Sequence, residues 1–255
     1  MTTHTDLHLC NDGSHTLYSE QFQQFYHNPN GAIAESRHNF FDVPGWLDQA
    51  EPGKPVHLFE VGFGTGLNLL LLLEYLHTRD PGLSITYYSV EAYPIPVQQA
   101  AKLNYPRLLD LPNAAELLAC IFRDTSPGPH QKVLCNGVTL HLFIGPFAKV
   151  PKPDFPIDVF LFDPFSPDVN PDLWSPNVFE TLASWSTPDA ILSTYGAATS
   201  SRAAMAMGGW SLARTRGALG KREMTLASPD PARLSSWKRL NEDRLRERYQ
   251  AGDFN

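Results

Sequence analysis

Five short apolar segments, separated by helix-like stretches, restrict the folds open to this chain more than any other feature of its sequence. Each segment is almost continuously apolar, which is typical of strands covered on both faces of a parallel sheet. The apolar segments are residues 56–62, 84–92, 138–145, 157–165 and 190–196. The helix-like stretches are residues 67–79, 97–104, 114–122 and 177–186. Strands that alternate with helices predict an α/β fold, with a doubly wound sheet and helices on both faces.

Both ends of the chain depart from this alternation. Residues 211–217 and 221–228 predict a β-hairpin, and the charged stretch 233–250 predicts a helix. A chain of 255 residues is long enough for one α/β domain with attachments. We therefore expect an N-terminal cap segment across the carboxyl edge of the sheet (1–50), a sheet domain (51–230) and a charged C-terminal helix (231–255).

The formal charge of −7 is distributed unevenly along the chain. Residues 1–200 hold 9 basic and 21 acidic side chains, a net charge of −12. Residues 201–255 hold 11 basic and 6 acidic side chains, a net charge of +5. The acidic majority suits a cationic ligand, while the basic C-terminal excess leaves a polyanionic partner open.

Several protein classes are excluded by composition. Three cysteines, Cys10, Cys120 and Cys135, are too few for a disulfide framework and indicate a reducing compartment. The N-terminus lacks the basic and apolar regions of a signal peptide, and no apolar run reaches the ~18 residues that a membrane span requires. The histidine spacing indicates no metal site. We expect a cytoplasmic protein without a membrane span or a bound metal.

A glycine-rich loop, FEVGFGTGLN, joins the first predicted strand to the first predicted helix. Gly62, Gly64 and Gly66 permit positive φ angles and let a ligand approach the backbone closely. The spacing differs from the dinucleotide fingerprint, because Leu67 occupies the position of the third glycine, and there is no Walker A motif. Glu60 disfavours a pyrophosphate and favours a ligand with a positive ammonium, such as S-adenosylmethionine. A tight turn without a ligand is the alternative interpretation.

Two further acidic residues come at predicted strand ends. Glu91 ends the second strand, where a carboxylate can accept both ribose hydroxyl protons. Asp163 ends the fourth strand and emerges between apolar walls, a setting for proton acceptance or cation binding. A solvent-exposed acid and a turn-capping Asp are the respective alternatives. Pro146 follows the third strand and offers no acidic or amide group for an adenine ring, which leaves backbone groups or another loop for that contact.

Three motifs carry a resemblance to a known family. They are E-x-G-F-G-T-G-L-N at 60–68, D-P-F-S-P-x-x-N-P-x-L-W at 163–174 and L-G-K-R-E-M at 219–224. Together they resemble the standalone form of the MnmC-type tRNA methyltransferases, and the resemblance extends from residues 12–41 to 220–228. It implies a Rossmann-like methyltransferase domain over residues 51–230, with a seven-stranded sheet whose last strand is antiparallel.

The resemblance also implies an activity. Family members methylate the exocyclic amine of 5-aminomethyl-2-thiouridine at the tRNA wobble position with S-adenosyl-L-methionine. Larger relatives fuse this domain to an oxidase that first removes a carboxymethyl group, so a separate oxidase or upstream wobble-uridine enzymes are expected partners. By the same resemblance, the methionine side of the cofactor contacts Glu60, Gly62, Gly64, Gly66 and Asn68. Glu91 then holds the ribose, and Asp163 faces the methyl group and binds the acceptor amine as the catalytic residue.

Binding of the tRNA anticodon region requires aromatic rings and cations. Phe165, Trp174 and Tyr195 lie at the predicted carboxyl edge, where an unpaired base can stack on them, although core packing is an equal or better account. Phosphate contacts are expected from the hairpin, by Arg216, Lys221 and Arg222. For the terminal helix a salt-bridged, solvated surface is the better account, because acidic side chains are interleaved with the basic ones.

Two rival functions remain open. The acidic pocket also suits a polyamine or other small-molecule amine alkyl- or methyltransferase of the same fold. A non-catalytic nucleotide-binding α/β protein is the second rival, and the intact Glu60, Glu91 and Asp163 argue against it.

Overall fold

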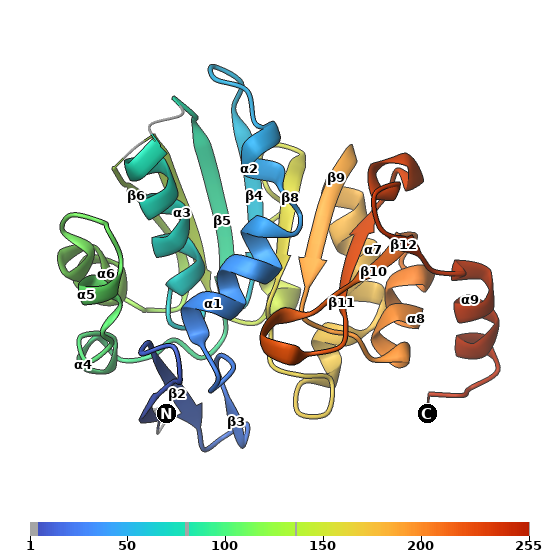
Figure 1. The fold of residues 1–255 in the computed structure, drawn as a ribbon, viewed down its shortest axis with the longest axis horizontal. Coiled ribbons are helices and arrows are strands. Elements are labelled where there is room, and N and C mark those ends of the chain that lie inside the picture. Colours follow the sequence, from blue (N-terminus) through green and yellow to red (C-terminus); the bar gives the residue numbers. More distant parts are fainter. Residues whose placement is uncertain (1–4, 80–81, 136, 255) are drawn as a thin grey trace.

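The structure, a computed structural model, describes residues 5–79, 82–135 and 137–254 (Figure 1). Residues 1–4 of the predicted cap and residue 255 of the predicted C-terminal helix lie outside this description. The centre of the structure is a sheet with the strand order β12-β10-β11-β9-β8-β4-β5-β7-β6. The five predicted apolar segments form its parallel strands, which are β4 (Val56–Val61), β5 (Ile85–Glu91), β7 (Val138–Ile144), β8 (Ile157–Phe162) and β9 (Ser186–Thr194).

Adjacent residues of a central strand enter different hydrophobic cores. Leu58 of β4 packs into the core that includes α3 (Leu67–Arg79), whereas Phe59 packs into the core that includes α7 (Pro176–Trp185) and α8 (Thr199–Met207). Both faces of the strand are therefore dry, which explains its continuous apolar sequence. The predicted α/β fold with helices on both faces is confirmed.

The predicted hairpin is also confirmed. It consists of β10 (Ser211–Thr215) and β11 (Met224–Ser228), joined through the short 3₁₀ turn η4 (Ala218–Gly220). Strand β11 inserts between β9 and β10 and runs antiparallel to both. An antiparallel strand near the end of the chain agrees with the architecture that the family resemblance implied.

The strand count differs from the expected seven, because nine strands are paired within the described residues. The two additional strands are at the edges: β6 (Gly128–Val133) pairs antiparallel with β7, and β12 (Lys238–Arg239) pairs with β10. The side chains of β6 alternate between partly buried and exposed, so its sequence has no apolar run to indicate a strand. Strand β12 has two residues, too few to show any pattern.

Helices α3 and α6 (Ala114–Phe122) have the predicted bounds, and α7 begins and ends one residue early. The predicted helix 97–104 is wrong in length, because α4 ends at Ala100 (Val97–Ala100) and α5 (Tyr105–Leu108) follows as a separate turn. Helix α8 was not predicted, because its sequence TSSRAAMAM is dominated by small residues and shows little apolar periodicity. Shorter 3₁₀ turns are η2 (Phe147–Lys149), η3 (Pro171–Trp174) and η5 (Pro231–Leu234).

The N-terminal segment has two parts. A small antiparallel sheet of β1 (Thr5–Leu9), β2 (His15–Ser19) and β3 (Gln24–Phe25) lies beyond the carboxyl ends of the parallel strands (Figure 1). Gln24 links it to the loop after β8 through two hydrogen bonds with Ser166, each of 2.9 Å. The chain then forms α1 (Ala32–Arg37), a π-helical turn (His38–Asp42) and α2 (Trp46–Gln49), which pack across one face of the large sheet.

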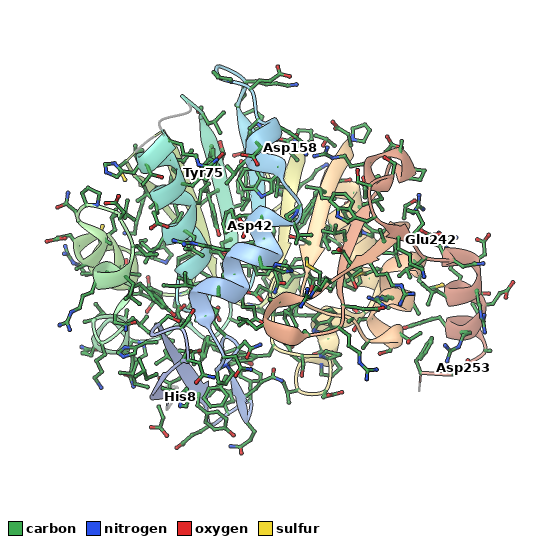
Figure 2. The ribbon with its side chains drawn as sticks, in the orientation of Figure 1. His8, Asp42, Tyr75, Asp158, Glu242 and Asp253 are labelled. Carbon is green, nitrogen blue, oxygen red and sulfur yellow. The ribbon has the colours of Figure 1, made fainter. Side chains whose placement is uncertain are left out.

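The C-terminal segment is helical only in its second half. The predicted helix over 233–250 is therefore too long, and α9 spans Glu242–Gln250. Asn241 caps it, accepting a 2.9 Å hydrogen bond from the backbone N–H of Arg244. Figure 2 shows Glu242 where this arm meets the sheet, and there its carboxylate accepts the backbone N–H of Leu212 at 2.6 Å. In the part of the chain that the structure describes, no helix is long and apolar enough to cross a membrane.

Candidate methyltransferase site

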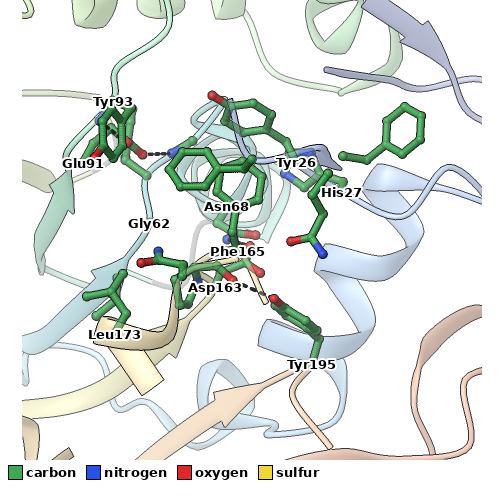
Figure 3. Close-up of a pocket in the computed structure, with 18 of the residues that line it drawn as sticks. Tyr26, His27, Gly62, Asn68, Glu91, Tyr93, Asp163, Phe165, Leu173 and Tyr195 are labelled. Carbon is green, nitrogen blue, oxygen red and sulfur yellow. Dashed lines mark hydrogen bonds between the residues drawn. The ribbon is translucent and has the colours of Figure 1, made fainter. Parts of the chain in front are cut away.

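A cavity of about 790 Å³ opens at the carboxyl edge of the sheet, under the N-terminal β-sheet. It is lined by the loops after β4, β5, β7 and β8, by residues 22–30 of the N-terminal segment and by the hairpin turn. In the view of Figure 3, Glu91 lies at one end of the cavity and Tyr195 at the other, with Asp163 between them. Ligands of open α/β sheets bind at this edge, so the cavity is the candidate site.

The glycine loop forms the floor of the cavity beside β8. Gly62, Gly64 and Gly66 all have positive φ, as predicted from their spacing. Gly62 has a φ of +90°, and a Cβ atom there would lie 2.8 Å from the backbone oxygen of Asp163. Only glycine lets the two strand ends approach this closely, so the loop keeps the carboxylate of Asp163 at the cavity wall.

Asn68, at the start of α3, bridges two carboxylates. Its amide nitrogen donates to Glu60 Oε1 at 2.9 Å and to Asp163 Oδ2 at 3.3 Å, and Ser89 Oγ donates to Glu60 Oε2 at 2.8 Å. Asn68 is 3% exposed, and its carbonyl oxygen has no hydrogen-bond partner among the described residues. An unpartnered buried acceptor beside the cavity is a feature that a donor on a bound ligand would satisfy.

Burial makes these acids prefer their protonated forms. Removal from water raises the pKa of Glu60 to about 8, although hydrogen bonds from Asn68 and Ser89 oppose the shift. Burial also raises the pKa of Asp163 well above its ordinary value, and the nearby Glu35 and Glu60 carboxyls add to this effect. A positive charge on a ligand would oppose both shifts, because it stabilises the ionised carboxylates, so the site favours a cation.

The carboxylate of Glu91 is held in place by hydrogen bonds from backbone N–H groups, one of them in the glycine loop. Its two oxygens accept the backbone N–H groups of Gly64 at 2.8 Å and Tyr93 at 2.7 Å. Burial raises the pKa of Glu91, and these backbone donors partly oppose the shift. Each oxygen keeps a lone pair, and the side chain lines the cavity, so the geometry is compatible with two ribose hydroxyl groups.

The structure brings an unpredicted pair of charges to this cavity. Glu35 of α1 is 8% exposed, accepts the backbone N–H of Asn28 at 2.7 Å and accepts the Lys221 ammonium at 2.7 Å. Sequence reasoning missed Glu35 because 186 residues separate it from Lys221. Its local sequence is an ordinary helical stretch that carries no site signal.

The three predicted aromatic residues have different positions. Phe165 lines the cavity and stacks on Phe22 with ring centroids 4.6 Å apart. Tyr195 also lines the cavity and donates its hydroxyl to the backbone oxygen of Pro164 at 2.7 Å. The prediction that Trp174 stacks on a base is wrong, because Trp174 is 5% exposed and packs in the hydrophobic core that includes β8. Its indole N–H donates to the backbone oxygen of Phe165.

The predicted basic residues of the hairpin are also divided. Lys221 faces Glu35 and the cavity, with its side chain 41% exposed, and its contact with phosphate stays a prediction. Arg216 and Arg222 are exposed, and neither side chain forms a salt bridge within the described residues. The terminal segment is salt-bridged as expected: Arg239 pairs with Glu242, Arg246 with Asp243 and Arg248 with Asp253.

Backbone groups line the cavity after β7. Residues 145–148 line it, and the N–H of Gly145 donates to the backbone oxygen of Glu91 at 2.8 Å. Pro146 and Phe147 are both part of this wall, which has no acidic or amide side chain between residues 145 and 148. Within the described ranges, no group of three or more His, Cys, Asp or Glu side chains is arranged to hold a metal.

A doubly wound sheet, a glycine loop of positive φ and acidic residues at the carboxyl ends of three strands are typical of S-adenosyl-L-methionine-dependent methyltransferases. A family model described as S-adenosyl-L-methionine-dependent methyltransferase matches residues 113–230. The residues fit this ligand by their donor set: Glu91 for a ribose, and the buried acids for a cation.

Within this class, the chain is similar to proteins called tRNA 5-methylaminomethyl-2-thiouridine biosynthesis bifunctional protein MnmC, as the sequence motifs indicated. It is 32% identical to that of Cupriavidus metallidurans over 90% of this chain, and 34% identical to that of Ectopseudomonas mendocina over 86%. The chain spans about a third of the length of these relatives, 34% and 35%. The crystal structure of MNMC2 from Aquifex aeolicus has the same fold, with a TM-score of 0.72 and 24% identity over 96% of this chain and 75% of that one.

Proposed function

We propose that this protein methylates the exocyclic amine of 5-aminomethyl-2-thiouridine at the wobble position of tRNA. The similarity to the MnmC proteins, over 90% of this chain in one case, is the observation that carries the proposal. The acidic cavity supports it, because the acceptor amine is a cation before it reacts. We further propose that the reaction takes place in the cytoplasm, on tRNA supplied by a separate oxidase or by other wobble-uridine enzymes.

The side chains of the cavity divide into two groups by role. When bound, S-adenosyl-L-methionine supplies an electrophilic methyl group on a sulfonium sulfur. Glu91 would hold the ribose, while Asn68 and the glycine loop would hold the methionine part. Glu60, which is buried and does not line the cavity, would act on the methionine part through its hydrogen bond from Asn68. Holding the donor and acceptor in line contributes up to ~7–11 kcal/mol in ideal cases, and this orientation is the main work of the protein.

Asp163 would position the amine and receive its proton. The bound ammonium would first give one proton to Asp163, which frees the nitrogen lone pair. The nitrogen would then form a bond to the methyl group as the carbon–sulfur bond of the donor breaks, which leaves a secondary ammonium and a neutral thioether. The raised pKa of Asp163 makes it a better proton acceptor than an exposed aspartate. Its hydrogen bond from Asn68 holds the carboxylate at the cavity wall.

The cavity also fits a second candidate, a small-molecule amine alkyl- or methyltransferase. The observation that favours it is the cluster of carboxylates, of which Glu35 and Glu60 are buried and Asp163 is partly buried, since these would attract any cationic amine. The non-catalytic alternative has no such support, because a simple nucleotide-binding site does not need two carboxylates bridged by one asparagine.

Labelled S-adenosyl-L-methionine distinguishes these functions. The protein is incubated with tRNA that carries 5-aminomethyl-2-thiouridine, with unmodified tRNA and with small polyamines, and nucleosides are then analysed. We expect label in 5-methylaminomethyl-2-thiouridine from the first tRNA alone. Label that appears only in a small amine would replace the tRNA function, and failure to bind the cofactor in calorimetry would leave the non-catalytic function.

A further inference from the structure

One charged pair of the cavity wall is not among the residues to which the proposed function assigns the cofactor. The Lys221 ammonium lies 2.7 Å from Glu35 Oε1 and 5.1 Å from the centroid of the Tyr195 ring. Glu35 is buried, whereas the Lys221 side chain is 41% exposed. The ammonium is thus held by a carboxylate and the face of an aromatic ring, the combination with which proteins bind alkylammonium ions.

The pair lies beside the proposed proton acceptor. Glu35 and Lys221 are both close enough to Asp163 to shift its pKa, in opposite directions. Tyr195 is fixed next to the same strand end by its hydrogen bond to Pro164. A primary amine bound between Glu35 and Tyr195 would therefore have Asp163 as a neighbour.

We propose that Lys221 is an internal stand-in for the acceptor amine, and that Glu35 and Tyr195 form the binding site for the primary ammonium of the substrate. A lysine side chain and an aminomethyl group both end in –CH₂–NH₃⁺. The aminomethyl group of the substrate can therefore replace the Lys221 ammonium at Glu35 without a change of charge. This inference rests on the proposed function for the identity of the acceptor. It makes Glu35 a substrate-binding residue, which no sequence motif indicated, and it gives Tyr195 an ammonium as its partner in place of the stacked base that the sequence predicted.

The hairpin turn allows the exchange. Lys221 directly follows η4, and the side chain is exposed enough to rotate into solvent without disturbing strands β10 and β11. In the same turn, Leu219 has a φ of +50°, a conformation that non-glycine residues rarely adopt, and it is 39% exposed at the cavity. The turn therefore presents both a removable cation and an apolar surface to an incoming aminomethyl base.

Binding of benzylamine, a simple aminomethyl-substituted ring, tests the exchange without tRNA. Calorimetry is performed on the full chain saturated with S-adenosylhomocysteine. Lys221→Met removes the competing ammonium, so we expect benzylamine to bind at least tenfold more tightly than to the wild type. Adding Glu35→Gln to that variant should abolish the gain, and neutral benzyl alcohol should bind all variants equally.

Controls separate these outcomes from damage to the fold. Lys238→Met removes an exposed lysine of β12 and should leave benzylamine affinity unchanged. Glu35→Gln keeps an acceptor for the Asn28 N–H, and its melting temperature shows whether it folds. Unchanged or weaker benzylamine binding by Lys221→Met overturns the inference, even if the wild type methylates tRNA. If tighter binding occurs and no tRNA is methylated, the amine site stands and the proposed tRNA function fails.

Discussion

At the scale of single residues, the site is a set of acids that the fold keeps away from water. Glu60, Asp163 and Glu35 are coupled through space, and Asn68 donates one amide group to two of them. Carboxylates this close together repel one another when they are ionised, and this repulsion lowers the stability of the folded protein. A cationic ligand would relieve the repulsion.

Asp163→Asn tests the proposed proton acceptor. Asparagine keeps an oxygen that accepts from Asn68, but it cannot take a proton, so we expect single-turnover methyl transfer to slow by roughly 10²–10⁴-fold. Cofactor affinity by calorimetry should change less than the rate. Asp168→Asn, an exposed position on the same loop, is the matched control. Near-normal turnover in Asp163→Asn would show that positioning alone suffices.

Glu60→Gln tests the burial of that acid through the pH dependence of stability. The folded pKa of about 8 lies above the ordinary value of 4.5, so between these pH values the folded state binds more protons than the unfolded state. The free energy of unfolding should therefore fall as pH rises across this window, by up to about 1.4 kcal/mol per unit.

Urea unfolding at pH 5 to 9 measures this slope. The wild type should lose stability relative to Glu60→Gln as pH rises, and the gap should level off above pH 8. Glu180→Gln, at an exposed position of α7, should run parallel to the wild type. Parallel curves for Glu60→Gln as well would mean that Glu60 is ionised in the folded protein.

At the scale of elements, the predictable parts are those in which local sequence decides the structure. Strands β4, β5 and β8 and helices α3 and α6 were predicted because their apolar patterns reflect burial that is continuous along the chain. Glu91 and Asp163 could be found because the carboxyl ends of parallel strands meet at one edge of the sheet.

Other elements depend on contacts between distant segments. Strand β12 is held by pairing with β10, and α9 begins late because Asn241 provides its cap. Glu35 reaches the site only because α1 packs near the hairpin turn. The predicted role of Trp174 was wrong because the direction of its ring depends on such contacts. The motif determines only how far Trp174 lies from Asp163 along the chain.

Gly62→Ala tests the close approach of the glycine loop to β8. The new Cβ would meet the backbone oxygen of Asp163 at 2.8 Å and its carbonyl carbon at 3.1 Å, and backbone atoms cannot rotate away. We expect a loss of about 1–3 kcal/mol in the free energy of unfolding and weaker cofactor binding.

Gly209→Ala is a matched control for this substitution. It has the same φ of +90°, but no atom lies within 4 Å of the added Cβ. The backbone strain is thus equal in the two variants, and their difference measures the steric contact. Equal losses in both would mean that the loop has no need of the close approach.

At the scale of the whole molecule, opposite charges are separated between the cavity and its surroundings. The acids gather inside the cavity, whereas Arg216 and Arg222 remain exposed on the hairpin near its opening. This arrangement suits a substrate whose reactive group is cationic and whose backbone is anionic, as in an aminomethylated tRNA.

Replacement of both arginines, Arg216→Ala with Arg222→Ala, should lower the affinity for tRNA. It should also make that affinity less sensitive to the salt concentration. Each lost phosphate contact lowers the slope of log K against log salt by about 0.7–0.9. The control is Arg246→Ala with Arg248→Ala, because these side chains are engaged by Asp243 and Asp253. Binding titrations from 50 to 200 mM salt measure both slopes, and an unchanged slope for the hairpin variant would place the RNA elsewhere.

The contact between Glu35 and Lys221 joins the first fifth of the chain to its last fifth. A chain still emerging from the ribosome can complete β4 to β9 and the glycine loop before the β10–β11 hairpin exists. In that interval the part of the cavity wall that residues 219–221 form is missing, whereas Glu35 and Tyr195 have already been synthesised. The lysine that competes with the acceptor amine is therefore added after the two residues that would bind that amine.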